Sequence, residues 1–145
     1  MYVVVRGSVA GRVASVWGRF AAFGDIAQWH PLIEHSALEE GLGPAGGPVR
    51  VMGTQDGGII REELLVSDAA AWTLSYLILD SPFPVSSYRA VVQLSESAVP
   101  EQCDIVWSAD FEPNDPADGP GLSAMFGEKV FEAGIAALDG AVEAL

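Results

Sequence analysis

Apolar and polar residues recur along this chain with two spacings, which predict its secondary-structure elements. Residues 2–6 form a β-branched run that is typical of a strand. Apolar side chains then recur every three or four positions, which predicts an amphipathic helix built on Val9, Val13, Val16, Trp17 and Phe20. Asp25 is expected to cap a short helical turn over residues 26–29, which ends before Pro31 because proline disfavours the α conformation in the preceding residue. One strand and two short helices are therefore expected first.

The middle of the chain has the pattern of an antiparallel sheet. Residues 41–58 are rich in glycine around residues 49–52, which indicates short strands joined by tight turns. Strand-like patterns then cover residues 59–67, 72–80, 86–96 and 102–111. In the last of these, alternate residues from Cys103 to Phe111 are apolar and those between them are mostly polar, as in a half-buried strand.

The end of the chain predicts one long helix. After a loop rich in proline and acidic residues (112–120), apolar residues recur at helical spacing: Leu122, Phe126, Val130, Ala133, Ala137, Ala141 and Leu145. Gly127, Gly134 and Gly140 weaken this helix, and they allow either close approach or movement. The order of elements predicts an α+β fold, in which a curved antiparallel sheet of about six to seven strands wraps around the C-terminal helix. Without a repeat or a dividing linker, residues 1–145 are expected to form one domain.

Charge and cysteine content exclude several functions. Twenty acidic residues against seven basic ones give a net charge of −13, so we expect no nucleic-acid partner. No apolar run approaches the roughly 20 residues that span a bilayer, and the first residues lack the pattern of a secretory signal. Cys103 is the only cysteine, which excludes an intramolecular disulfide and a thiolate zinc site. We therefore expect a cytoplasmic protein without an integral membrane segment.

A series of short pieces in a set order carries a family resemblance. The pieces are Trp29-His30-Pro31, residues 47–50, Glu62-Glu63-Leu64-Leu65 with Asp68, residues 76–88 around Ser81-Pro82-Phe83-Pro84-Val85, and residues 107–113. Together they resemble the SRPBCC superfamily, and within it the bacterial polyketide cyclase/dehydrase-like branch. The resemblance implies a helix-grip fold, similar to the START lipid-transfer and birch-pollen-allergen domains, with an apolar cavity between the sheet and the last helix.

Strand alternation predicts what such a cavity contains. With Leu64 and Val66 facing the core, Glu62 shares their face, whereas Arg61 and Glu63 point the other way. A register slip of one residue would reverse every one of these assignments. The inner face is expected to carry a few polar groups among aliphatic side chains, as small-molecule sites do: Glu62, Tyr76, Tyr88 and Trp107.

The candidate ligand-binding residues combine this face with the cavity's edges: Trp29, Arg50, Glu62, Tyr76, Phe83, Tyr88, Trp107 and Phe126. Arg50 pairs with Glu62 or a ligand oxyanion, or else it is an exposed strand residue. Trp29 is either a portal residue or the hydrophobic anchor of the short helix. Phe83, between two prolines, closes over a ligand or packs on the helix.

Glu62 and His30 are the candidate general bases. A buried Glu62 needs a hydrogen-bond donor or a raised pKa, because an unpaired carboxylate is costly in apolar surroundings. His30 and His35 do not have the spacing of helical zinc ligands, and Pro31 interrupts the helix that such a site needs. We expect neither a metal nor a cofactor.

Three functions remain. The first is binding of a hydrophobic or amphipathic small molecule, lipid-like or polyketide-like. The second, which the resemblance implies, is an aromatase/cyclase that performs aldol cyclisation and dehydration, with Glu62 or His30 as base and Arg50 among the donors. Those enzymes, as aligned, carry an arginine where this chain has Leu64 and Leu65, which favours binding. The third is a structural or partner-binding domain with a filled core. The sequence leaves the oligomeric state open.

Overall fold

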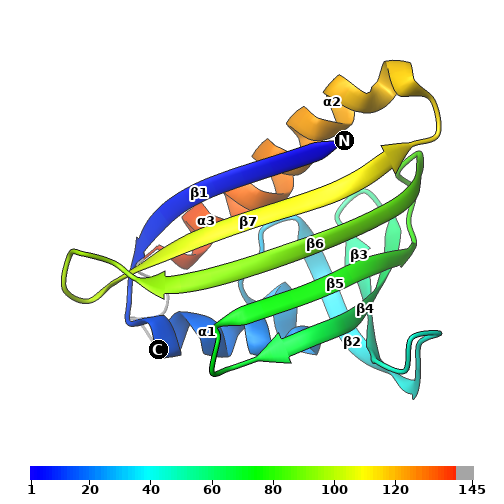
Figure 1. Cartoon of the computed structure of the whole chain (residues 1–145). Coiled ribbons are helices and arrows are strands. Elements are labelled where there is room, and N and C mark those ends of the chain that lie inside the picture. The colour runs from blue at the N-terminus through cyan, green and yellow to red at the C-terminus, as the bar shows by residue number, and fades with distance from the viewer. Residues whose placement is uncertain (140–145) are drawn as a thin grey trace.

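Seven strands form one curved antiparallel sheet in the computed structural model, which describes residues 1–139 (Figure 1). Their order across the sheet is β1-β7-β6-β5-β4-β3-β2, so consecutive strands from β2 to β7 are neighbours and β1 pairs with β7. The strands are β1 (Tyr2–Ala10), β2 (Ile33–Leu42), β3 (Pro48–Thr54), β4 (Ile59–Asp68), β5 (Thr73–Asp80), β6 (Val85–Glu96) and β7 (Gln102–Pro113).

Helices follow β1 and β7, as the sequence predicts, although their bounds differ from the predicted ones. After β1 come α1 (Val13–Ala21) and the 3₁₀ helix η1 (Phe23–Gln28). After β7, a 3₁₀ turn, η2 (Pro116–Asp118), leads into α2 (Gly119–Met125), the π-helical segment η3 (Phe126–Glu132) and α3 (Ala133–Leu138). Figure 1 shows the last three as one long helix running beside β1 and β7. The α+β helix-grip architecture is confirmed.

Three local predictions at the start of the fold are corrected. Val9 belongs to strand β1 and not to the first helix, which begins at Val13. Asp25 does not cap the second helix, because that helix begins at Phe23 and Asp25 lies inside it; the capping position is Ala22, without a side-chain hydrogen bond. Strand β2 has no counterpart in the predicted elements. It is an edge strand, and seven of its ten residues are exposed without alternation, so it leaves no period-two signal in the sequence.

The predicted apolar stripe of the last helix is correct at Leu122 and Phe126 and wrong beyond them. The buried side chains after Phe126 are Phe131, Ile135 and Leu138, whereas Val130, Ala133 and Ala137 stay partly exposed. Phe126 and Phe131 are five positions apart, which is the i→i+5 spacing of a π turn. The π segment therefore shifts the buried face by one residue. Gly140, Ala141 and Leu145 lie outside the described residues.

A bulge in β4 corrects one inward assignment. Leu64 pairs with Tyr76 but Val66 pairs with Ser75, so β4 carries one residue more than β5 at this point. Val66 consequently turns to the outer face, where it is 38% exposed. Glu62 and Leu64 precede the bulge and keep the predicted face, opposite Ile78 and Tyr76.

The other glutamate, Glu63, faces the convex side as predicted and is nevertheless fully buried. Its carboxylate accepts hydrogen bonds from the backbone N–H groups of Ala45 and Gly47, both at 2.9 Å. Glu63 therefore anchors the turn between β2 and β3, and it has no contact with the concave side of the sheet.

Two clusters of buried side chains fill the concave side. The larger lies between the sheet, α1 and the C-terminal helix. The smaller consists of Ile26, Ile33, Met52 and Ile60, on η1 and strands β2 to β4. Trp29 and Phe83 are packed against both clusters.

Gly134 permits the close approach between the last helix and the larger cluster. A β-carbon at Gly134 would lie 2.8 Å from Trp107 Cζ3 and 3.0 Å from His30 Cδ2. Both distances are shorter than ordinary van der Waals contact, and both neighbours are rigid rings in buried positions. The sequence left open whether the glycines of the last helix allow close approach or movement. At Gly134 the structure shows close approach.

We predict that Gly134→Ala lowers the free energy of unfolding by about 1–3 kcal/mol, because the overpacking exceeds the gain in helix propensity. Gly121→Ala is the matched control, since a β-carbon there meets nothing within 4 Å; it should stabilise by up to about 1 kcal/mol. Urea denaturation of both variants measures the two effects, and a stabilised Gly134→Ala would contradict the close-contact account.

Candidate functional site

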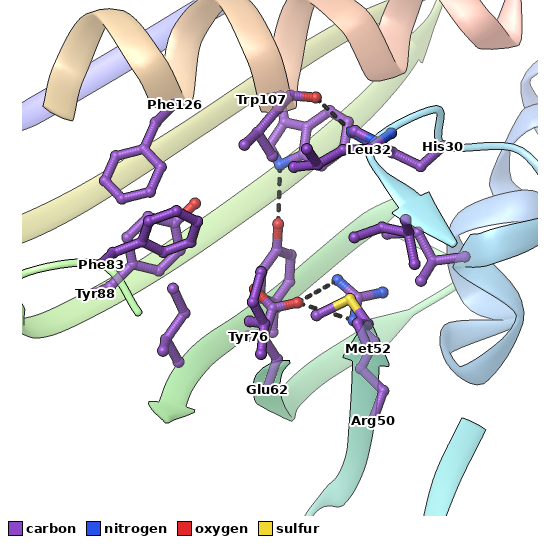
Figure 2. A pocket seen from close by; sticks show the side chains of 15 residues that line it. His30, Leu32, Arg50, Met52, Glu62, Tyr76, Phe83, Tyr88, Trp107 and Phe126 are labelled. Carbon is purple, nitrogen blue, oxygen red and sulfur yellow. Dashed lines mark hydrogen bonds and ion pairs between the residues drawn. The ribbon is translucent and has the colours of Figure 1, made fainter. Parts of the chain in front are cut away.

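A small pocket lies between the two clusters of buried side chains. It is lined by residues from both clusters, the last helix and the loop between β5 and β6: Ile26, His30, Leu32, Ile33, Arg50, Met52, Ile60, Glu62, Tyr76, Ile78, Phe83, Tyr88, Trp107, Phe126 and Val130 (Figure 2). The cavity volume is about 30 Å³, which corresponds to room for about one water molecule.

Most of the predicted site residues meet in this pocket. Arg50, Glu62, Tyr76, Phe83, Tyr88, Trp107, Phe126 and the candidate base His30 all line it, whereas Trp29 does not. Trp29 packs edge-to-face on Phe20, with ring centroids 5.2 Å apart, as expected for a hydrophobic anchor of the short helix. The ligand-binding and catalytic roles assigned to these residues stay predictions.

Several apolar lining residues were not predicted, although their signal is present in the sequence. Met52 lies two positions after Arg50 on β3, and Ile60 lies two positions before Glu62 on β4. Residues two apart on a strand share a face. The positions of Arg50 and Glu62 therefore predict that Met52 and Ile60 also face the pocket. Ile33 and Leu32 had no such signal, because they lie at the end of an edge strand and in a loop. Val130 belongs to the predicted apolar stripe of the last helix, although it was not named as a ligand-binding residue.

The polar centre of the pocket is an ion pair between two opposed strand residues. Arg50 and Glu62 are directly paired in the β3–β4 register. Arg50 Nε donates to Glu62 Oε1 at 2.9 Å, and Nη2 lies 2.7 Å from the same oxygen, with side-chain exposures of only 4% and 9%. Burial raises the pKa of Glu62, and the adjacent guanidinium opposes this shift.

Arg50 is held from several sides. Its Nη1 donates to the backbone carbonyl of Phe23 at 3.2 Å. Its guanidinium carbon lies 3.9 Å from the ring centroid of Phe23 and 4.8 Å from that of Tyr76, so it makes cation–π contacts with two rings. The pairing with Glu62 is thus the alternative that holds for Arg50, and the guanidinium has a defined position in the pocket wall.

Next to the ion pair lie two buried tyrosines and a tryptophan. Trp107 Nε1 donates to the Tyr76 hydroxyl oxygen at 3.2 Å (Figure 2). Burial raises the pKa of Tyr76, and burial together with the neighbouring Tyr76 raises the pKa of Tyr88 well above its ordinary value. Both hydroxyls therefore remain protonated around neutral pH and are able to donate hydrogen bonds.

His30 connects two backbone segments at the edge of the pocket. Its Nδ1 accepts the backbone N–H of Leu32 at 3.1 Å, and its Nε2 lies 2.7 Å from the carbonyl oxygen of Val130. These partners assign the proton to Nε2, since a carbonyl only accepts. Burial lowers the pKa of His30, in keeping with a neutral ring whose two nitrogens are both occupied.

The pocket opens towards solvent through a mouth formed by its four partly exposed residues, Leu32, Ile78, Phe83 and Val130. Phe83 comes from the short loop between β5 and β6 and packs edge-to-face on Phe126, with centroids 5.2 Å apart. His30 binds the backbones of Leu32 and Val130, so one side chain connects two sides of the mouth.

The two candidate bases differ in what their polar atoms contact. His30 uses both ring nitrogens in contacts with the backbone, so it presents no free lone pair in this geometry. Glu62 is ion-paired to Arg50 through Oε1. Within residues 1–139, no group of three or more His, Cys, Asp or Glu side chains is placed to hold a metal ion.

We predict that His30 makes stability fall as the pH is lowered. Because its pKa is below the ordinary 6.5, the unfolded chain takes up a proton between pH 6.5 and the lower folded-state pKa, and the folded chain does not. The free energy of unfolding should therefore decrease in this window by up to about 1.4 kcal/mol per pH unit. Urea denaturation at pH 7.5 and 5.5 measures this loss.

His30→Gln should lose less stability than the wild type between these two pH values. His35→Gln is the matched control, because His35 is the other histidine and is exposed; it should keep the wild-type dependence. Comparing variants cancels the opposite contribution of Glu62, whose raised pKa adds stability as the pH falls. An unchanged dependence in His30→Gln would show that His30 is not the titrating group.

The family model for polyketide cyclase / dehydrase and lipid transport proteins matches residues 3–143. A protein from Thermobifida fusca is 30% identical, with a TM-score of 0.84 over 99% of this chain and 94% of that one. An uncharacterised protein from Bacillus thuringiensis is 26% identical, with a TM-score of 0.84 over 99% of both chains.

The Zhui aromatase/cyclase from Streptomyces has the same fold at 19% identity, with a TM-score of 0.75 over 99% of this chain and 93% of that one. No curated protein matches the sequence. None of the described helices is long and apolar enough to cross a membrane. With nearly its whole length matched, the chain belongs to the polyketide cyclase/dehydrase and lipid transport family.

Proposed function

We propose that this protein binds a hydrophobic or amphipathic small molecule in the pocket between the sheet and the C-terminal helix. The observation that carries the proposal is the buried Arg50–Glu62 pair in an otherwise apolar wall. A buried ion pair is often no better for stability than apolar side chains of similar volume. Its place beside a cavity, with two tyrosine hydroxyls close by, is better explained by recognition of a polar group on a ligand.

The size of the pocket adds a requirement. A volume of about 30 Å³ is far below the roughly 300–1,000 Å³ of typical ligand sites. Binding therefore requires the mouth to open, by movement of Phe83 and Leu32, which both lie on loops. Such segments open more readily than strands do, because they have fewer backbone hydrogen bonds.

The family supports the proposal in its broad form, since its description includes lipid transport. Aromatase/cyclase activity, the alternative, lacks a supporting observation in the pocket. It needs a base that takes a proton from the substrate. Both nitrogens of His30 are engaged by the backbone, and the Glu62 carboxylate is ion-paired to Arg50 through Oε1, which makes it a weaker base than a free carboxylate. Leu64 and Leu65 also stand where those enzymes, as aligned, have an arginine.

A structural domain with a filled core is the competing interpretation, and a fluorescent probe distinguishes the two. N-phenyl-1-naphthylamine is suitable because it is uncharged, so the net charge of −13 does not repel it. We expect it to bind the wild type with increased fluorescence. Phe83→Ala should bind it about tenfold more tightly, because less apolar contact has to be broken to open the mouth.

Leu42→Ala is the matched control, because Leu42 is 70% exposed and lies outside the pocket; it should behave as the wild type does. Native mass spectrometry of the protein from its own host should in addition show a ligand-sized excess that disappears on denaturation. A protein without mass excess that fails to bind the probe, in the wild type and in Phe83→Ala alike, would establish the filled core instead.

A further inference from the structure

The formal charges inside the pocket cancel. Among the residues of the range 1–139 that line the pocket, only Arg50 and Glu62 are of charged type, and they neutralise each other at 2.7 Å. His30 is neutral because its Nδ1 accepts a backbone hydrogen bond, and the buried tyrosines keep their protons. A ligand that enters therefore meets hydrogen-bond donors but no uncompensated charge.

Glu62 occupies the position that a ligand carboxylate would take on Arg50. The guanidinium is held by the Phe23 carbonyl and by the rings of Phe23 and Tyr76, so it is not free to turn to a second anion. A ligand carboxylate would have to share Arg50 with Glu62, and two like charges in a buried site repel strongly. A neutral oxygen has no such penalty.

Donors for a neutral oxygen remain. A guanidinium has five N–H groups, and the contacts with Glu62 and Phe23 use one on each of its three nitrogens. An alcohol or ketone oxygen accepts from such groups without bringing a charge into the pocket.

We propose that Glu62 sets the charge specificity of this pocket: it acts as a resident carboxylate on Arg50, so that the pocket takes uncharged apolar molecules with a hydroxyl or carbonyl oxygen and rejects carboxylates. This inference rests on the proposed function and deepens it. According to this inference, Glu62 alone decides whether the pocket prefers an uncharged or an anionic ligand. Without the Glu62 carboxylate, Arg50 is a buried and uncompensated cation, which is the environment that favours an anionic ligand.

The test is displacement of N-phenyl-1-naphthylamine by 1-octanol and by octanoate at pH 7.5, where octanoate is ionised. The two competitors share their chain length and differ in charge. We expect 1-octanol to bind the wild type at least about tenfold more tightly than octanoate, and Glu62→Gln to reverse this order. Glu63→Gln is the matched control, because it removes a neighbouring buried carboxylate that faces away from the pocket; it should keep the wild-type preference.

Should Glu62→Gln fail to fold, the double variant Arg50→Met/Glu62→Met replaces the pair by apolar side chains, which a buried site often tolerates. An apolar pocket without the pair prefers 1-octanol only because the alcohol leaves water more easily than octanoate does. The ratio of the two affinities of the double variant should therefore match the ratio expected from transfer of each competitor from water to an apolar phase. Equal binding of the competitors to the wild type, or tighter binding of octanoate, would overturn the inference and leave the binding function standing. Failure of the probe to bind the wild type and Phe83→Ala alike, without a mass excess in the protein from its own host, would remove the proposed function, and the inference with it.

Discussion

A guanidinium buried among apolar side chains has to be compensated on every side, and this constraint organises the site. Arg50 is 4% exposed and lies opposite Glu62 in the strand register. Removing one partner of such a pair leaves a buried charge that costs about 3–5 kcal/mol. The β3–β4 register, the position of η1 through the Phe23 carbonyl and the orientation of Tyr76 are therefore coupled through one side chain. A rearrangement of any of these elements would expose Arg50 or deprive it of a partner.

A second set of contacts connects the C-terminal helix to Arg50 and its partners. His30 binds the Val130 carbonyl, and Gly134 lets the helix approach both His30 and Trp107. Trp107 in turn donates to Tyr76, whose ring covers one face of Arg50. A continuous chain of contacts thus runs from the helix to the ion pair. The Phe83 side of the mouth lies outside this chain and is held by an apolar contact with Phe126, so the opening that the proposed function requires would leave the polar centre intact there.

Periodicity in the sequence was sufficient to predict the fold except for β2, and it predicted several polar residues of the lining. Most elements are long enough for a spacing of two or about 3.6 residues to repeat, and Glu62, Tyr76 and Trp107 each follow the alternation of a strand. The pairing of Arg50 with Glu62 was left open, because it depends on the register between β3 and β4, and a short glycine-rich hairpin does not determine that register. The near closure of the pocket depends on how the rotamers of Phe83, Met52 and Leu32 fill space, and no pattern along one chain encodes this.

Two inward assignments failed for one physical reason, which is a single added residue that shifts the phase of an element. In β4 the bulge after Leu64 turns Val66 outward, and in the last helix the π segment moves burial from Val130 to Phe131. Both irregularities lie next to the pocket, since Leu64 pairs with Tyr76, and Val130 lines the mouth.

The π turn lets successive helix positions serve two purposes: Val130 faces the mouth and presents its carbonyl to His30, while Phe131 stacks on Trp107 with centroids 5.0 Å apart. Irregular geometry of this kind is frequent at functional sites. The two irregularities, one beside the partner of Tyr76 and one at Val130, are more easily reconciled with a binding site than with a core that has only to be filled.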